Sequence, residues 1–249
     1  MGILSAIIIG ALLIYGILVT PTRQPYRDAL AQYENVGRAN ATLTAAGASL
    51  NASKASGEEF EKNIQTAQKA LVSLEKENEA LAKKDVLKEG EGKAKYDAYN
   101  AKLQEYITYN ENILASMLIV RPVLFECNKG MTDITDGPES IVAIRSCSAE
   151  LAKLEGITDA DYKVLVISFQ DDYDNLADIL EQMAAEKAAN GENSAQYKAF
   201  ASQRDEALEQ LSTTSSEFSK SVQQHRNQIL TTDTEKVLGD YLKDNSRIF

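Results

Sequence analysis

Few residues of this chain have both the type and the spacing that chemistry needs. The two cysteines, Cys127 and Cys147, stand close enough in the sequence to form a disulfide. Such a bond would close a loop of about 20 residues and contribute on the order of 3 kcal/mol to stability, in a segment with little apolar content of its own. Two free buried thiols are the alternative. Zinc would need more soft ligands than two cysteines without a nearby histidine.

Acidic side chains gather at two places. Four aspartates lie along one predicted helix, beside its apolar stripe: Asp171, Asp172, Asp174 and Asp178. Paired carboxylates perform acid–base chemistry only in a cleft that perturbs their pKa values, so we interpret this group as a solvated helix face. A second group, Asp133, Asp136 and Glu139, lies in a loop but lacks the spacing of an EF-hand calcium site.

The remaining reactive residues are isolated. His225 is the only histidine, near the end of a predicted helix without a cysteine nearby, and we interpret it as a surface or seam residue. The sequence has neither a glycine-rich phosphate loop nor a nucleophile with its base. We therefore predict a non-enzymatic protein without catalytic, cofactor-binding or metal-ligating residues and without a cofactor. The formal net charge of −11 would repel phosphate backbones, so we expect no nucleic-acid partner.

Helical periodicity organises the rest of the chain. One apolar stripe advances in alternating steps of four and three residues: Phe60, Ile64, Ala67, Leu71, Leu74, Asn78 and Leu81. The same register returns later: Tyr162, Val166, Phe169, Tyr173, Leu176, Leu180 and Met183. Each stripe follows a capping box, from Ser56 to Glu59 and from Thr158 to Asp161, and precedes a glycine-containing loop. We predict an all-α, elongated, coiled-coil-like helical bundle built from two tandem copies of a helical hairpin, with two unrelated hairpins as the alternative.

These patterns divide the chain into segments. We expect a transmembrane anchor (1–20), a membrane-proximal helix with a small-residue spacer (21–55), a first hairpin (56–127), a junction with a short helix (128–157), a second hairpin (158–230), and a short helix with a tail (231–249). Pro21 and Pro25 are expected to stop or kink the first helix. The small, polar residues 39–56 form either a pliant spacer or a thin helix lying on the hairpin.

The anchor is predicted from residues Gly2 to Thr20, which carry no charge. A helix of that length spans roughly 28 Å, close to the hydrocarbon core of a bilayer. A cleavable secretory signal is the main rival, but the basic n-region is missing. Gly2, Ala6 and Gly10 recur every four residues and would let a second membrane helix approach closely, unless they reflect only the usual composition of membrane helices.

The sequence contains opposing signals about membrane topology. Arg23 and Arg27 follow the apolar segment and favour a cytoplasmic body. Asn40 and Asn51 begin acceptor patterns for glycosylation, and a disulfide would need an oxidising compartment. Because long domains cross membranes largely regardless of flanking charge, we expect an extracytoplasmic body, at the cell surface or in the periplasm. A cytoplasmic body is the alternative.

These expectations favour a non-catalytic stalk, scaffold or adhesion-type interaction protein. It would contact membrane lipid through residues 1–20 and bind protein partners, including copies of itself. The first alternative is a filament subunit, because the uncharged N-terminal helix with Pro21 near its end resembles the spine of type IV pilins. The resemblance covers only about the first 30 residues, and Ser5 stands where those pilins have a glutamate. The second alternative is a ligand-sensing helical domain.

Overall fold

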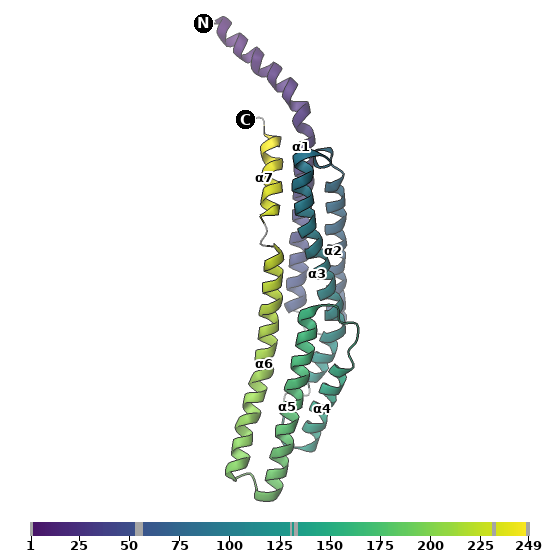
Figure 1. Ribbon diagram of the computed structural model, residues 1–249, viewed down its shortest axis with the longest axis vertical. Helices are drawn as coiled ribbons and strands as arrows, with labels where there is room; N and C mark the ends of the chain where they lie inside the picture. Colours follow the sequence, from purple (N-terminus) through teal and green to yellow (C-terminus); the bar gives the residue numbers. More distant parts are fainter. Residues whose placement is uncertain (1, 53–56, 130, 132–133, 231–232, 248–249) are drawn as a thin grey trace. The chain divides into compact units, whose positions relative to one another are not determined.

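The computed structural model of the chain consists of long helices joined by short turns (Figure 1). It describes the side chains of residues 22–50, 57–129, 131, 134–229 and 233–247, and the helical backbone of residues 2–21, 51–52 and 230. All regular structure in these ranges is helical and none is strand. The predicted all-α class is confirmed.

The helices begin and end close to the predicted positions. They are α1 (Gly2–Ala52), α2 (Glu58–Ala82), α3 (Gly90–Lys129), α4 (Pro138–Ala152), α5 (Ala160–Asn190), α6 (Ala195–Leu230) and α7 (Thr234–Ser246), with a 3-10 turn, η1 (Asp85–Leu87), between α2 and α3. The predicted hairpin helices correspond to α2 with α3 and α5 with α6. The two predicted short helices correspond to α4 and α7.

The first helix differs from expectation. α1 continues through Pro21 and Pro25 as far as Ala52, so these prolines do not stop the helix, and of the two predicted effects only a kink stays a prediction. Each proline removes one backbone hydrogen bond, but the residues beyond them form a long buried face whose packing offsets that loss. The face consists of Ala29, Val36, Ala39, Leu43, Ala46 and Leu50. The small-residue segment as far as Leu50 is therefore a packed thin helix and not a pliant spacer.

The predicted anchor falls largely outside the described side chains. Residues 2–20 have a helical backbone in α1, but their side chains are not among those described. The predicted packing face of Gly2, Ala6 and Gly10 therefore lies outside the described residues. Among the residues that the structure describes, no helix is long and apolar enough to cross a membrane.

The chain forms two compact units. Unit 1 comprises residues 1–51, 65–108 and 228–249. Its core brings together side chains from α1, α2, α3 and α7, among them Ala29, Val36, Leu71, Leu74, Leu81, Tyr96, Tyr99, Tyr106, Leu238 and Leu242. Gln32 on α1 donates hydrogen bonds from Nε2 to the backbone oxygen of Glu77 at 2.9 Å and to its Oε2 atom at 2.7 Å.

Unit 2 comprises residues 52–64 and 109–227. It contains the start of α2, the second half of α3, and α4, α5 and most of α6. Its buried side chains include Phe60, Ile64, Leu114, Met117, Val120, Ile144, Leu151, Tyr162, Phe169, Tyr173, Leu176, Leu180 and Met183. The predicted first hairpin (56–127) therefore contributes residues to both units, a division that its sequence pattern does not indicate.

Both predicted stripes are buried along their whole length. Each of the seven residues from Phe60 to Leu81, and each of the seven from Tyr162 to Met183, is buried. The polar member of the first stripe is satisfied, since Asn78 donates from Nδ2 to Asn100 Oδ1 at 2.6 Å and accepts a hydrogen bond from the Tyr96 hydroxyl at 3.3 Å. The helical register read from the sequence is confirmed.

Truncating a stripe residue should therefore destabilise the protein strongly. Leu74 and Leu176 are both 0% exposed. Replacing either by Ala should lower the free energy of unfolding by roughly 2–5 kcal/mol, because the lost apolar contacts leave a cavity. Denaturant titration followed by circular dichroism measures this change. Val72→Ala is the matched control, since Val72 lies on the same helix as Leu74 but is 62% exposed. A loss at Val72 as large as that at Leu74 would contradict the assigned register.

Candidate functional site

The cysteines meet in unit 2. Cys127, near the end of α3, and Cys147, in α4, form a disulfide with their Cα atoms 5.5 Å apart. The predicted pairing is therefore present in the structure. It ties α4 to α3 across a connecting segment that has little apolar content of its own.

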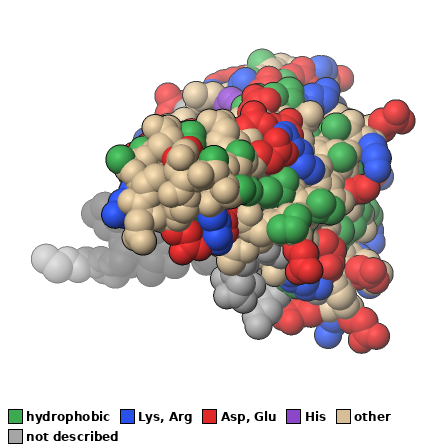
Figure 2. Space-filling view, turned by 90° about the horizontal axis from the view of Figure 1, so that it is seen from below, with side chains coloured by type: hydrophobic (Ala, Val, Ile, Leu, Met, Phe, Trp, Pro, Cys, Tyr) green, Lys and Arg blue, Asp and Glu red, His purple; other side chains and the backbone are tan. Residues whose placement is uncertain are grey.

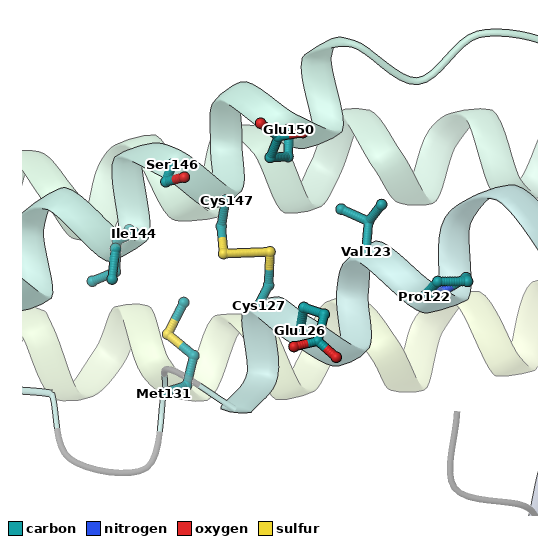
Figure 3. A pocket seen from close by; sticks show the side chains of 10 residues that line it. Pro122, Val123, Glu126, Cys127, Met131, Ile144, Ser146, Cys147 and Glu150 are labelled. Carbon is teal, nitrogen blue, oxygen red and sulfur yellow. A yellow bond between two sulfur atoms is a disulfide. The ribbon is translucent and has the colours of Figure 1, made fainter. Parts of the chain in front are cut away.

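A cleft of about 540 Å³ lies beside the disulfide (Figure 3). Its walls come from α3, α4 and the turn between them: Pro122, Val123, Glu126, Cys127, Met131, Ala143, Ile144, Ser146, Cys147 and Glu150. Glu126 and Glu150 are exposed, while the remaining lining is mostly apolar. The cleft thus offers apolar surface but no nucleophile paired with a base, and it has the chemistry of a packing surface rather than of a reaction centre.

A polar cluster at the start of α5 was not predicted. Ser116 on α3 is fully buried, and its Oγ accepts hydrogen bonds from the backbone N–H groups of Asp159 at 3.0 Å and Thr158 at 3.2 Å. Asp159 caps α5 by accepting a hydrogen bond from the Tyr162 N–H at 2.9 Å. The sequence pattern placed the cap at Thr158, one residue too early. Asp159 is also a good capping residue, so only the chain path distinguishes the two.

Asp161 is the buried centre of this cluster. It is only 7% exposed, and its two carboxylate oxygens lie 2.7 Å from Ser221 Oγ and 2.7 Å from His225 Nδ1, both on α6. In a Ser-His-Asp triad the imidazole stands between the hydroxyl and the carboxylate. Here the carboxylate stands between the other two, so the imidazole does not activate Ser221. The arrangement binds α6 to α5.

The carboxylates of Asp159 and Asp161 lie close together in a largely buried site. The pKa of Asp159 is raised above its ordinary value of 3.8, first because burial desolvates the carboxylate, and further because Asp161 is nearby. Hydrogen bonds from the backbone of Tyr162 and Asp161, and the proximity of His225, act in the opposite direction but do not cancel the rise. Burial similarly raises the pKa of Tyr109, whose hydroxyl donates to the Val222 carbonyl at 3.0 Å.

The aspartates of α5 serve several different contacts. Arg145 on α4 pairs with Asp174 at 3.4 Å, with Glu181 at 3.1 Å and with Asp178. Asp172 accepts a hydrogen bond from Thr214 on α6 at 2.6 Å, while Asp171 is exposed. On the face of the molecule seen in Figure 2, acidic and basic side chains are intermixed. These carboxylates are partly solvated and partly engaged in ion pairs that hold the helices together.

The structure describes only part of the predicted acidic loop group. Asp136 accepts a hydrogen bond from the Tyr197 hydroxyl at 3.0 Å and lies 3.4 Å from Lys187 Nζ, whereas Asp133 lies outside the described residues. In the described part of the chain, no group of His, Cys, Asp and Glu side chains has the arrangement of a metal site.

The two predicted glycosylation acceptors are only partly described. Asn40 lies on α1 with a half-buried side chain, and its Oδ1 atom accepts no hydrogen bond from the described residues. The side chain of Asn51 lies outside the described set. Glycosylation of either residue stays a prediction.

Sequence reasoning missed two constellations: the Asp161, Ser221 and His225 cluster and the Arg145 ion pairs. His225 and Asp161 are 64 residues apart, and Arg145 and Glu181 are 36 apart. The sequence offered one signal for the first of these: a charged residue, Asp161, stands directly beside Tyr162 at the start of the apolar stripe.

No family model, no curated protein and no solved structure matches the chain.

Neutralising Asp159 should stabilise the protein in a pH-dependent way. Because its folded-state pKa is raised, the unfolded chain loses this proton at lower pH than the folded protein does, and folding stability falls as the pH rises through that interval. Asp159→Asn keeps the capping oxygen and removes the charge. Thermal unfolding of the variant should therefore show a higher midpoint at pH 7, with the advantage disappearing at pH values below the ordinary pKa.

The matched control for this variant is Asp171→Asn, an exposed site on the same helix, which should show no such pH-dependent gain. A lower midpoint for Asp159→Asn at neutral pH would mean that the hydrogen bonds to the ionised carboxylate outweigh its desolvation.

Proposed function

We propose that the chain is a membrane-anchored, non-catalytic helical scaffold that holds its bundle close to a membrane and presents it to protein partners. The observation that carries the proposal is the continuity of α1. One helix includes the uncharged sequence from Gly2 to Thr20 and the face that packs into the core of unit 1. An apolar segment attached in this way has no flexible linker, so a membrane that received it would hold unit 1 at a defined distance.

The length of the uncharged segment supports the anchor. A 19-residue helix of about 28 Å matches the thickness of a bilayer core, and the first charged residue, Arg23, comes just beyond it. The buried face that the structure describes on α1 runs from Ala29 to Leu50, beyond the uncharged segment. A long uncharged and apolar helix is costly to expose to water, which favours insertion into lipid.

Electron microscopy and membrane extraction test this proposal together. The full chain should stay with membranes after an alkaline carbonate wash, dissolve only in detergent, and then appear as separate particles. A variant lacking residues 2–20 should be released by the wash, while its circular dichroism spectrum stays strongly helical. Release of the full chain by carbonate would contradict the anchor. Ordered polymers in detergent would favour the filament alternative, with Gly2, Ala6 and Gly10 as the first contacts to examine.

We further propose that the body of the protein is extracytoplasmic. The Cys127–Cys147 disulfide supports this location, because cytosolic thiols are normally kept reduced. The arginines that follow the apolar segment favour the opposite orientation, but charge bias is weak for long translocated domains.

The oxidation state in native membranes decides the question of location. After alkylation of free thiols under denaturing, non-reducing conditions, mass spectrometry should find the peptides of Cys127 and Cys147 linked and unalkylated. Two fully alkylated thiols would place the body in a reducing compartment instead. Reduction before alkylation is the control, and should make both cysteines reactive.

A further inference from the structure

Three segments of unit 1 meet at the end from which the N-terminal part of α1 emerges (Figure 1). They are residues 22–28 of α1, residues 83–95 around η1, and residues 241–247 of α7. Arg27 Nε donates a hydrogen bond to the Ser246 carbonyl at 3.2 Å, and the rings of Tyr26 and Tyr241 pack edge to face with centroids 5.9 Å apart. Lys95 Nζ lies 5.6 Å from the centre of the Tyr241 ring. These contacts place all three segments at one level of the helix axis.

This end is basic although the chain is acidic. The whole chain has 26 Lys and Arg against 37 Asp and Glu, whereas the three segments contain nine Lys and Arg against five Asp and Glu. Four of these nine cations pair with nearby carboxylates: Lys88 with Asp85, Lys93 with Asp97, Lys95 with Glu91, and Arg247 with Asp244. Five cations of the three segments then remain against two carboxylates, Asp28 and Glu89.

Those five residues are Arg23, Arg27, Lys83, Lys84 and Lys243, and we call them the basic end. Lys83 and Lys243 are exposed, and Arg23, Arg27 and Lys84 are half-buried. Within the described residues none of the five forms an ion pair, and Arg27 bonds only to an uncharged carbonyl. Their charge is thus available to an external anion.

The position of the basic end along α1 indicates which anions it meets. Arg23 and Arg27 follow Thr20 by three and seven residues, which corresponds to about 5 Å and 10 Å along the helix. The headgroup layer extends about 5–7 Å beyond the hydrocarbon core, so Arg23 lies at the level of the headgroups. Arg27 lies only a few Å above them, within the Debye length of about 8 Å at physiological salt. Basic side chains next to a membrane helix are attracted to a bilayer surface that carries anionic lipid, so a contact of this kind needs such lipid in the leaflet that faces unit 1.

We infer that the basic end of unit 1 binds anionic phospholipid headgroups of the membrane that holds residues 2–20. The inference rests on the proposed anchor and adds a second contact to it. A single helix leaves the attached body free to tilt. Cations contributed by α1, by the α2–α3 turn and by α7 would contact the same surface beside that helix and restrain the tilt, so unit 1 would stand in a fixed orientation on an anionic surface.

Lysine labelling of the full chain in vesicles tests this inference. The protein is reconstituted into vesicles of phosphatidylcholine alone or of phosphatidylcholine mixed with phosphatidylglycerol, and is briefly exposed to a membrane-permeant amine reagent. Mass spectrometry should show that Lys83, Lys84 and Lys243 react several-fold more slowly in the anionic vesicles. Lys69 and Lys76, exposed on α2 of the same unit and farther from this end, should react equally in both. High salt should abolish the difference.

A pair of variants sharpens the test. Lys83→Gln combined with Lys84→Gln should lower the salt concentration at which Lys243 loses its protection. The matched pair Lys69→Gln and Lys76→Gln should leave that concentration unchanged. Equal sensitivity of Lys243 to both pairs would show a general charge effect and overturn the inference.

The remaining outcomes separate the inference from the proposed anchor. Reconstituted chain that a carbonate wash removes from both kinds of vesicle refutes the anchor itself. Retained chain whose basic-end lysines react equally in both vesicle types refutes the headgroup contact alone. Protection that occurs in native membranes but not in anionic vesicles would replace lipid with an acidic protein partner, which also overturns the inference.

Discussion

The structure depends on covering the apolar stripes of α2 and α5. A helix on its own cannot bury such a stripe. Even a pair of neighbouring helices leaves part of each stripe in contact with water. In unit 1 the stripe of α2 is covered by residues of α1, α3 and α7, so a core forms from segments as distant as Ala29 and Leu242. The elements that look secondary in the sequence, the spacer and the last short helix, are therefore necessary parts of the bundle.

α1 shows how this constraint affects the chain near the predicted membrane. Half of its described buried face consists of alanines, with Val36, Leu43 and Leu50 between them, so parts of α1 can lie close to its neighbours. Tyrosines supply the volume that the alanines lack, since Tyr33 and Tyr99 pack with ring centroids 5.7 Å apart. The Tyr33 hydroxyl also donates to the Glu235 carbonyl at 2.8 Å, which holds α7 against the same helix. Small residues and Tyr33 on α1 thus pack with Tyr99 on α3 as one surface.

Unit 2 holds its last long helix in a different way. In the described part of α6, Ala207 is buried, while the larger apolar residues on the same side, such as Phe200, Leu211 and Phe218, are half-buried. Polar contacts supplement this thin apolar face: Thr214 donates to Asp172, and Ser221 and His225 meet Asp161. Buried carboxylates of this kind are costly unless they are paired, so each contact also penalises any other placement of α6. The disulfide between Cys127 and Cys147 likewise holds α4 against α3.

Patterns that extend over a few residues were enough to predict the local structure. Helices, the register of Phe60 to Leu81 and of Tyr162 to Met183, the turns between them and the proximity of Cys127 to Cys147 all follow from neighbours within one or two helical turns, or from a short loop. These interactions have the same geometry in any fold, which explains why the sequence alone determined them.

Only the tertiary structure decided which helices share a core. α2 and α3 supply residues to both units, α1 continues through Pro21 and Pro25, and Asp159 rather than Thr158 caps α5. The tertiary structure also decided that Asp161 contacts His225. It likewise decided that Arg27, Lys83 and Lys243 lie at one end of unit 1. Each depends on the partner that a helix face finds tens of residues away, and the spacing of residues along a single helix carries no information about that partner.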